Sequence, residues 1–168
     1  MSEGATVTLE DGRRVTLRPG ATGDGAAIMD VHRASILGLG EDFYSRDELE
    51  SWAAGLRAER YGEAMASGET FLLAWADGDV LAGFATYKAD EVIGFYIHPD
   101  WARLGLGKLL LARAEAAIAA AGHRTIRIGA SLSGLPFYLA HGYRLVRRKP
   151  WTTRGGLVIE TADLEKPI

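Results

Sequence analysis

Apolar and polar residues alternate in several short stretches of the chain, and each stretch predicts a β-strand. Two such runs lie within residues 7–18, on either side of Asp11-Gly12, a dipeptide that favours tight hairpin turns. A meander of three adjacent strands is predicted further along, with its first turn at Asp77-Gly78-Asp79, over residues 70–75, 80–87 and 91–98. Gly94 lies inside the last of these strands, where a glycine often marks a bulge.

Other stretches repeat their apolar residues at the spacing of a helix. Residues 24–37 follow this spacing and end at Gly38. Ser45 and Glu48 match a capping box, in which both side chains bond to backbone amides at a helix start. The clearest helix covers residues 106–121, which are rich in Ala and Leu and are closed by Gly122. Shorter helices are predicted over residues 58–66 and 135–140.

The order of elements in the second half determines the fold class. A strand over residues 125–130 follows the long helix, and a pair of strands over residues 143–151 and 157–164 closes the chain. A helix between two strands implies a parallel crossover, so we expect an α/β fold with a mixed sheet flanked by helices. With 168 residues, 48% of them hydrophobic, the chain is expected to form one domain over residues 1–168.

Composition narrows the classes of function. With a net charge of −3, the chain lacks the excess of basic residues that is typical of nucleic-acid-binding proteins. Because it has no cysteine, disulfides and a thiol nucleophile are excluded. No group of His or acidic residues has the spacing of a metal site, so no metal is expected. The first residues lack the charged and then apolar pattern of a signal peptide. No run approaches the roughly 18 apolar residues of a membrane span. We therefore expect a cytoplasmic protein without nucleic-acid or membrane partners.

The chain passes from the meander into the long helix through a glycine loop. A helix start has unpaired amides and a partial positive charge, and Gly105 and Gly107 would let a phosphate approach the backbone. A P-loop would need a hydroxyl after Lys108, where the chain has Leu109, and a dinucleotide fingerprint would need glycine in place of Leu110. The alternative is that the two glycines simply relax a tight turn.

Two motifs resemble those of one enzyme family. Ala102-Arg-Leu-Gly105-Leu-Gly107 resembles the Gln/Arg-x-x-Gly-x-Gly/Ala pyrophosphate loop of the GNAT acetyltransferases, although Ala102 replaces the usual Gln or Arg and only Arg103 offers a charge. Tyr138 to Tyr143 resembles the family's Tyr-x-x-x-Gly-Phe motif. By these motifs the chain is identified as a member of the GNAT superfamily of N-acetyltransferases, and it is similar to a subgroup of small bacterial single-domain members.

This resemblance implies the GNAT acyl-CoA N-acyltransferase fold, acetyl-CoA as co-substrate, and direct acetyl transfer to a primary amine of a small molecule or of a protein or peptide. Tyr138 would act as the general acid that protonates the departing thiolate. A core aromatic is the alternative for Tyr138, and a helix cap is the alternative for Ser131. The residues that the resemblance assigns to the cofactor are Phe95, Tyr96 and Ile97 on a splayed strand, Arg103, Leu104, Gly105, Leu106, Gly107 and Lys108 in the loop, and Ser131 and Tyr138.

The base that deprotonates the amine is less apparent from the sequence. Glu91 is favoured because it opens the cofactor strand, but many relatives have an acid two residues later, where this chain has Ile93. Deprotonation through water is an alternative. The other candidates are His32, Glu41, Asp42 and His98.

The identity of the acceptor is also open. Acidic and aromatic residues between 41 and 52 suit a cationic or aromatic amine, or they form a capped, solvated helix. A non-catalytic module that binds or senses coenzyme A is the alternative function, motivated by Ala102 and Ile93. Both a monomer and a homodimer agree with the sequence.

Overall fold

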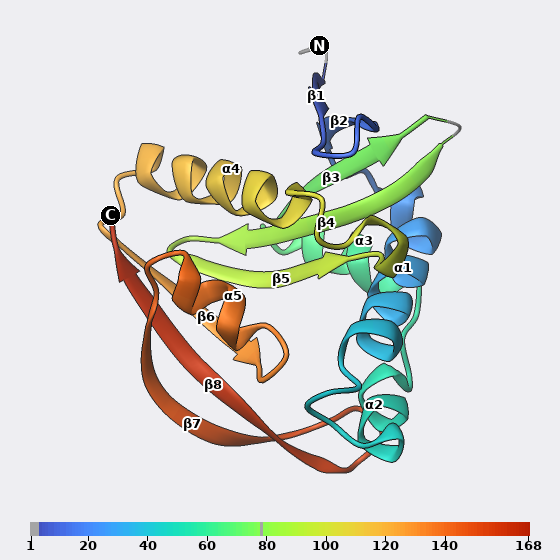
Figure 1. Cartoon of the computed structure of the whole chain (residues 1–168), viewed down its shortest axis with the longest axis vertical. Coiled ribbons are helices and arrows are strands. Elements are labelled where there is room, and N and C mark those ends of the chain that lie inside the picture. The colour runs from blue at the N-terminus through green and yellow to red at the C-terminus, as the bar shows by residue number, and fades with distance from the viewer. Residues whose placement is uncertain (1–3, 78) are drawn as a thin grey trace.

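An eight-stranded mixed sheet forms the centre of the computed structural model, which describes residues 4–77 and 79–168 (Figure 1). Residues 1–3, which begin the segment predicted to lack a signal peptide, and Gly78 of the predicted turn lie outside the described residues. The strand order is β1-β2-β3-β4-β5-β6-β8-β7, and only β5 and β6 are parallel neighbours. The strands are β1 (Ala5–Thr8), β2 (Arg14–Pro19), β3 (Thr70–Ala76), β4 (Val80–Lys88), β5 (Glu91–Ile97), β6 (Thr125–Ser131), β7 (Arg144–Thr152) and β8 (Val158–Pro167).

The helices lie close to their predicted positions. The capping box is confirmed, because the Glu48 amide donates to Ser45 Oγ over 3.2 Å and the Ser45 amide donates to Glu48 Oε1 over 3.0 Å. Gly122 has a φ of +94°, as expected of a glycine that follows a helix. The α-helices are α1 (Gly25–Leu39), α2 (Arg46–Ala53), α3 (Glu59–Ala66), α4 (Leu106–Ala120) and α5 (Leu135–Ala140), with 3-10 turns η1 (Thr22–Asp24) and η2 (Pro99–Trp101).

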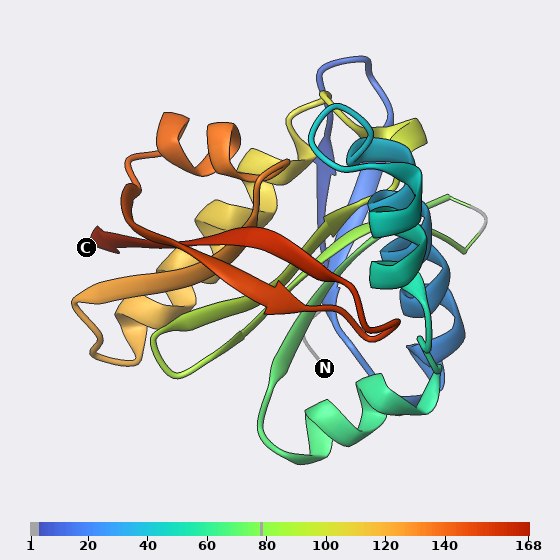
Figure 2. The same ribbon diagram turned by 90° about the horizontal axis from the view of Figure 1, so that it is seen from below.

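Helices cover both faces of the sheet (Figure 2). On one face, Leu106 and Leu110 of α4 pack against Ala82 and other small residues of the central strands. On the other face, Ile28 of α1 packs with Phe84 and with residues of α3. Since β4 is covered on both faces, it is almost entirely buried, and burial of this apolar surface is the main source of stability.

The two halves of the sheet separate at the parallel pair. β5 and β6 pair only at Glu91↔Arg127 and Val92↔Ile128. Beyond this point β5 has a bulge, where the Gly94 amide donates to Thr86 Oγ1 over 2.8 Å and a Cβ on Gly94 would lie 2.9 Å from the same oxygen. The bulge that Gly94 predicted is therefore confirmed, and the following residues of β5 are free on their β6 side.

The hairpin of β7 and β8 reaches α2, as Figure 2 shows. The Gly155 amide donates to the Ser51 carbonyl over 2.9 Å, Arg154 donates to the Trp52 carbonyl, and the Ser51 and Thr153 hydroxyls bond over 2.6 Å. These bonds tie α2 to the far end of the sheet. None of the helices in the described part of the chain has both the length and the apolar character needed to cross a membrane.

Candidate active site

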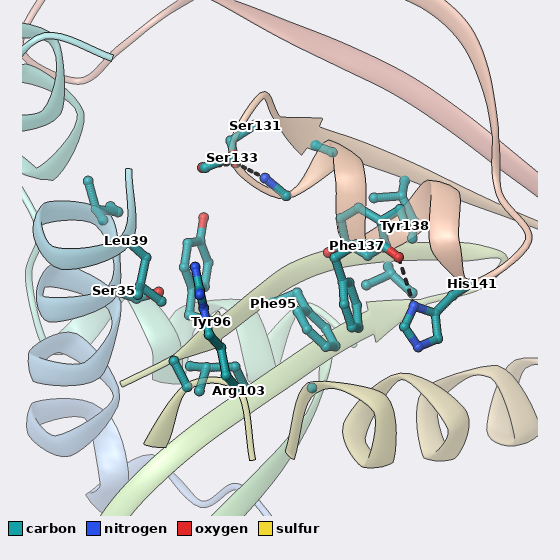
Figure 3. A pocket seen from close by; sticks show the side chains of 18 of the residues that line it. Ser35, Leu39, Phe95, Tyr96, Arg103, Ser131, Ser133, Phe137, Tyr138 and His141 are labelled. Carbon is teal, nitrogen blue, oxygen red and sulfur yellow. Dashed lines mark hydrogen bonds between the residues drawn. The ribbon is translucent and has the colours of Figure 1, made fainter. Parts of the chain in front are cut away.

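A cavity of about 500 Å³ lies beside the separated ends of β5 and β6. Its walls bring together segments that are far apart in the sequence: the loop before α4, both separated strands, α5, and the first two helices. Figure 3 labels side chains that face it from α1, β5, the loop before α4, the end of β6 and α5. A volume of this size suits a small-molecule ligand.

The loop before α4 forms one end of the cavity. Gly105 occupies the N-cap position of α4 with a φ of +85°, and Gly107 follows in the first turn. Arg103 has a φ of +62°, a strained conformation for a residue with a side chain, and strained residues often cluster at functional sites. With Lys108, these residues line the cavity, so free amides and two cationic side chains meet there. Leu104 and Leu106 do not line the cavity and pack in the core under α4.

The strand β5 forms the floor of the cavity with Phe95, Tyr96 and Ile97. The Phe95 ring stacks on Phe137 of α5 with 5.5 Å between the ring centroids. The Tyr96 ring packs against His32 of α1, with the centroids 4.0 Å apart. Because the hydroxyl of Tyr96 is desolvated, the pKa of Tyr96 is raised to about 12.

Tyr138 of α5 faces the same cavity. Its ring is buried among aromatic neighbours, with Phe95 at 5.9 Å and Phe137 at 5.4 Å between centroids. Burial raises the pKa of its phenol well above the usual value, and the nearby Tyr96 adds to this shift. The hydroxyl forms no hydrogen bond with the described residues. Tyr138 is thus both a core aromatic and a protonated phenol at the cavity wall.

Ser131 lies at the end of β6, on the way to α5. Its hydroxyl bonds to the Ser133 hydroxyl over 2.8 Å and accepts from the Gly134 amide over 3.2 Å. Ser131 therefore closes the turn before α5 without capping the helix, whose N-cap residue is Gly134, and it also lines the cavity.

The candidate bases are spread over the structure. Glu91 is at the start of β5, where it pairs with Lys88 in register, and it is not part of the cavity wall. The His98 ring accepts from the Asp100 amide over 3.1 Å, outside the cavity. His32 is buried against Tyr61, and desolvation lowers the pKa of its imidazole to about 3, with smaller effects from nearby cations. Glu41 is also outside the wall, so Asp42 is the candidate base that lines the cavity.

Several wall residues were not expected from the sequence. Glu10, in the turn between β1 and β2, places its carboxylate 3.2 Å from where a Cβ on Gly105 would be. His141 bonds to the Phe137 carbonyl over 2.7 Å and joins the wall from the end of α5. Ser35 and Leu39 enter it from α1. No local pattern marks these residues, because tertiary packing brings them to the cavity.

Metal ligands are not grouped at this cavity or elsewhere in residues 4–77 and 79–168, where no three His, Asp or Glu side chains lie together in a set that could hold a metal ion.

Comparison with known structures shows the same architecture. A GCN5-related N-acetyltransferase from Rhodopseudomonas palustris is 28% identical, with 98% of each chain covered and a TM-score of 0.85. The PaiA N-acetyltransferase of Thermoplasma acidophilum, solved in complex with coenzyme A, is 23% identical over 92% of this chain and 99% of that one, with a TM-score of 0.71. A phosphinothricin acetyltransferase from Sinorhizobium meliloti, solved with AcCoA, is also 23% identical, over 92% and 88% of the two chains, with a TM-score of 0.65.

The comparison of sequences gives the family. The two structures below 25% identity establish the shared fold alone, and no curated protein matches the chain in sequence. The model of the acetyltransferase (GNAT) domain matches residues 41–159, which include both motifs and most of the cavity wall. The chain therefore belongs to the GNAT acetyltransferase family.

Proposed function

We propose that this protein transfers the acetyl group of acetyl-CoA directly to a primary amine of a small molecule or peptide, within a single domain formed by the whole chain. The main support is that the glycine loop, the separated strand β5 and Tyr138 all line one cavity. Coenzyme A or AcCoA is present in two structures with the same fold. The continuous sheet from β1 to β8 supports the assignment of one domain.

The phosphates of the cofactor would bind at the start of α4. The amides of Gly105, Leu106 and Gly107 supply hydrogen-bond donors and the positive end of the helix dipole. Arg103 and Lys108 add two positive charges at the same end of the cavity. Arg103 thereby compensates for Ala102, which has no polar side chain.

The pantetheine arm would lie along β5. Residues 95–97 pair with β4 on one side and lack a strand partner on the other, because β6 has already separated. Their free backbone groups can bond to the amides of the arm and polarise the acetyl carbonyl. Ser131 faces the same gap from β6.

Tyr138 would then supply the proton of the reaction. As the amine nitrogen bonds to the acetyl carbon and the carbon–sulfur bond breaks, the nitrogen loses its second proton to solvent and the phenol donates its proton to the departing sulfur. Its raised pKa keeps this proton in place at physiological pH. Solvent returns the proton to Tyr138 after the products leave.

The proton of the incoming ammonium requires a separate acceptor. The position of Asp42 in the cavity wall supports a role for it as the direct acceptor. Glu91 could act only through water, since its side chain is outside the cavity wall. We therefore favour Asp42 or solvent as the first proton acceptor.

A thiol-release assay tests the function. The purified protein is incubated with acetyl-CoA and a panel of amines, and acetylated products are identified by mass spectrometry. We expect turnover with at least one amine, with one acetyl group transferred per thiol released. Tight binding of coenzyme A without thiol release from any amine would contradict catalysis and would favour the non-catalytic module.

A further inference from the structure

Part of the cavity wall is not explained by the two motifs. We call this part the acceptor end, and it is formed by α1, the following connection and α2. Since it belongs to the same cavity as Tyr138, a molecule bound there can reach the acetyl group. The residues of the acceptor end are Ser35, Ile36, Leu39, Asp42, Phe43 and Trp52.

Apolar side chains dominate the acceptor end. Leu39 and Phe43 are 39% and 45% exposed, although they are large and hydrophobic, and both face the cavity. The Trp52 ring is held edge-on by Tyr44 at 5.9 Å and by Trp151 at 6.4 Å between centroids. An apolar ligand would bury the exposed surface of Leu39 and Phe43, which is favourable.

Tyr44 holds the Trp52 ring and the connection between α1 and α2 in place. Its hydroxyl donates to the Glu160 carbonyl over 2.6 Å and accepts from the Leu132 amide over 2.8 Å. The connection between α1 and α2 is thereby bonded both to β8 and to the turn after β6. An apolar group that enters would meet a wall that is already ordered, so it loses little binding energy to rearrangement.

Ser35 adds a polar group to this apolar surface. It is only 8% exposed, and its hydroxyl forms no hydrogen bond with the described residues. Figure 3 shows Ser35 on α1, facing the cavity beside Tyr96. Because Ser35 lines the cavity, its hydroxyl can bond to a polar group of a ligand that enters.

The charge of the acceptor end selects against anions. Asp42 is its single charged side chain and forms no ion pair with the described residues. The cations of the cavity, Arg103 and Lys108, come from the loop before α4 and its first turn, and Figure 3 shows Arg103 beside Tyr96. An ammonium group held beside Asp42 is attracted to its carboxylate, whereas a carboxylate or phosphate held beside Asp42 would be repelled.

We propose, on the basis of the proposed function, that the acceptor is a small amine with an aromatic-sized apolar body and no anionic group. The apolar body lies between Leu39, Phe43 and Trp52. Asp42 attracts the ammonium form, and the Ser35 hydroxyl bonds to the amine or to a polar group beside it. A cation beside the aromatic faces of Phe43 and Trp52 is stabilised further.

Matched substrates test this proposal. Phenethylamine and phenylalanine differ by one carboxylate, and spermidine has amines without an apolar body. We expect kcat/KM for phenethylamine to exceed that for each of the other two by about tenfold or more. The carboxylate of phenylalanine would be unpaired in the pocket, and spermidine would make fewer apolar contacts. An equal or higher value for phenylalanine or spermidine would overturn the proposal.

Matched variants test whether the named residues cause the preference. Phe43→Ala should raise KM for phenethylamine by about fivefold or more, because it removes an exposed wall of the pocket. Asp42→Asn should reduce the preference for phenethylamine over phenylalanine by about threefold or more. Glu41→Gln is the control, since Glu41 is the adjacent exposed acid outside the wall.

The readouts separate this proposal from the proposed function. Coenzyme A affinity should be unchanged in all three variants, because none lies at the phosphate end. If the wild type neither binds coenzyme A nor releases thiol, the proposed function fails. If it is active but Phe43→Ala and Asp42→Asn behave like Glu41→Gln, only the proposed acceptor class is wrong.

Discussion

The two ends of the cavity are built in different ways. The phosphate end depends on backbone geometry: two glycines at the start of α4, a residue with positive φ, and a strand that has lost its partner. The acceptor end depends on side chains that packing brings together from α1 and α2. Backbone geometry requires particular residues in consecutive positions, whereas a side-chain wall can be made by many combinations. The first end therefore suits a constant cofactor and the second a variable acceptor.

The largest effect is expected at the phosphate end. Gly105→Glu would place a carboxylate and a strained backbone at the start of α4, and we expect it to weaken coenzyme A binding by about 100-fold or more. Gly122→Glu is the control, because Gly122 has a similar φ of +94° at the other end of the same helix. Calorimetric titration of both variants measures the difference. Equal affinities in the two variants would show that the loop is only a turn.

Tyr138→Phe should separate chemistry from binding. Loss of the phenol proton should lower kcat by about 100-fold, as expected for general acid catalysis, while the affinity for coenzyme A changes by less than about twofold. Steady-state kinetics and a titration with coenzyme A check both values. An unchanged kcat would leave Tyr138 as a core aromatic and would require another proton donor.

The core behind Tyr96 should respond to pH. The pKa of His32 is lowered to about 3 by burial, so between pH 6.5 and pH 3 the unfolded chain binds a proton that the folded chain does not. Stability is therefore lost as the pH falls through this window. The neighbouring phenols of Tyr61 and Tyr96 stay protonated in this range, because burial raises the pKa of each to about 12.

The expected loss in free energy of unfolding from this histidine is about 2 kcal/mol between pH 7 and pH 5. Denaturant unfolding of the wild type and of His32→Asn at both pH values measures it, since contributions from other groups cancel in the difference. Parallel pH dependence of the two proteins would mean that His32 titrates normally in the fold.

The smallest effect is expected from Glu10. Its carboxylate lies beside Gly105, so it would repel the cofactor phosphates. Glu10→Gln should tighten coenzyme A binding by about threefold at low salt, less at high salt, and should leave pantetheine, which lacks phosphates, unaffected. Glu41→Gln serves again as the control. Weaker binding in Glu10→Gln would instead assign this carboxylate a favourable contact with the cofactor.

The same contrast explains what the sequence could predict. The capping box at Ser45, the bulge at Gly94 and the helix end at Gly122 were predictable because each depends on neighbouring residues. The two motifs led to the family for the same reason. Glu10 and Ser35 could not be predicted as wall residues. Their positions depend on where the turn between β1 and β2 packs and on how α1 is rotated about its axis.

The roles of individual site residues remain predictions. Leu104 and Leu106 were predicted to bind the cofactor from their place in the motif, but their side chains pack in the core, so only their backbone can contribute. Glu91 was favoured as the base because of its strand, yet the start of β5 is where that strand still pairs with β6, before the cavity opens.

The central claim is that one cavity joins a cofactor end to an acceptor end. Calorimetric titration of the wild-type protein with acetyl-CoA tests it most directly. We predict binding at a single site with a dissociation constant on the order of micromolar, as is common for substrates of enzymes. Absence of binding under conditions where the protein is folded would contradict the account, because the glycine loop would then be a turn without a ligand.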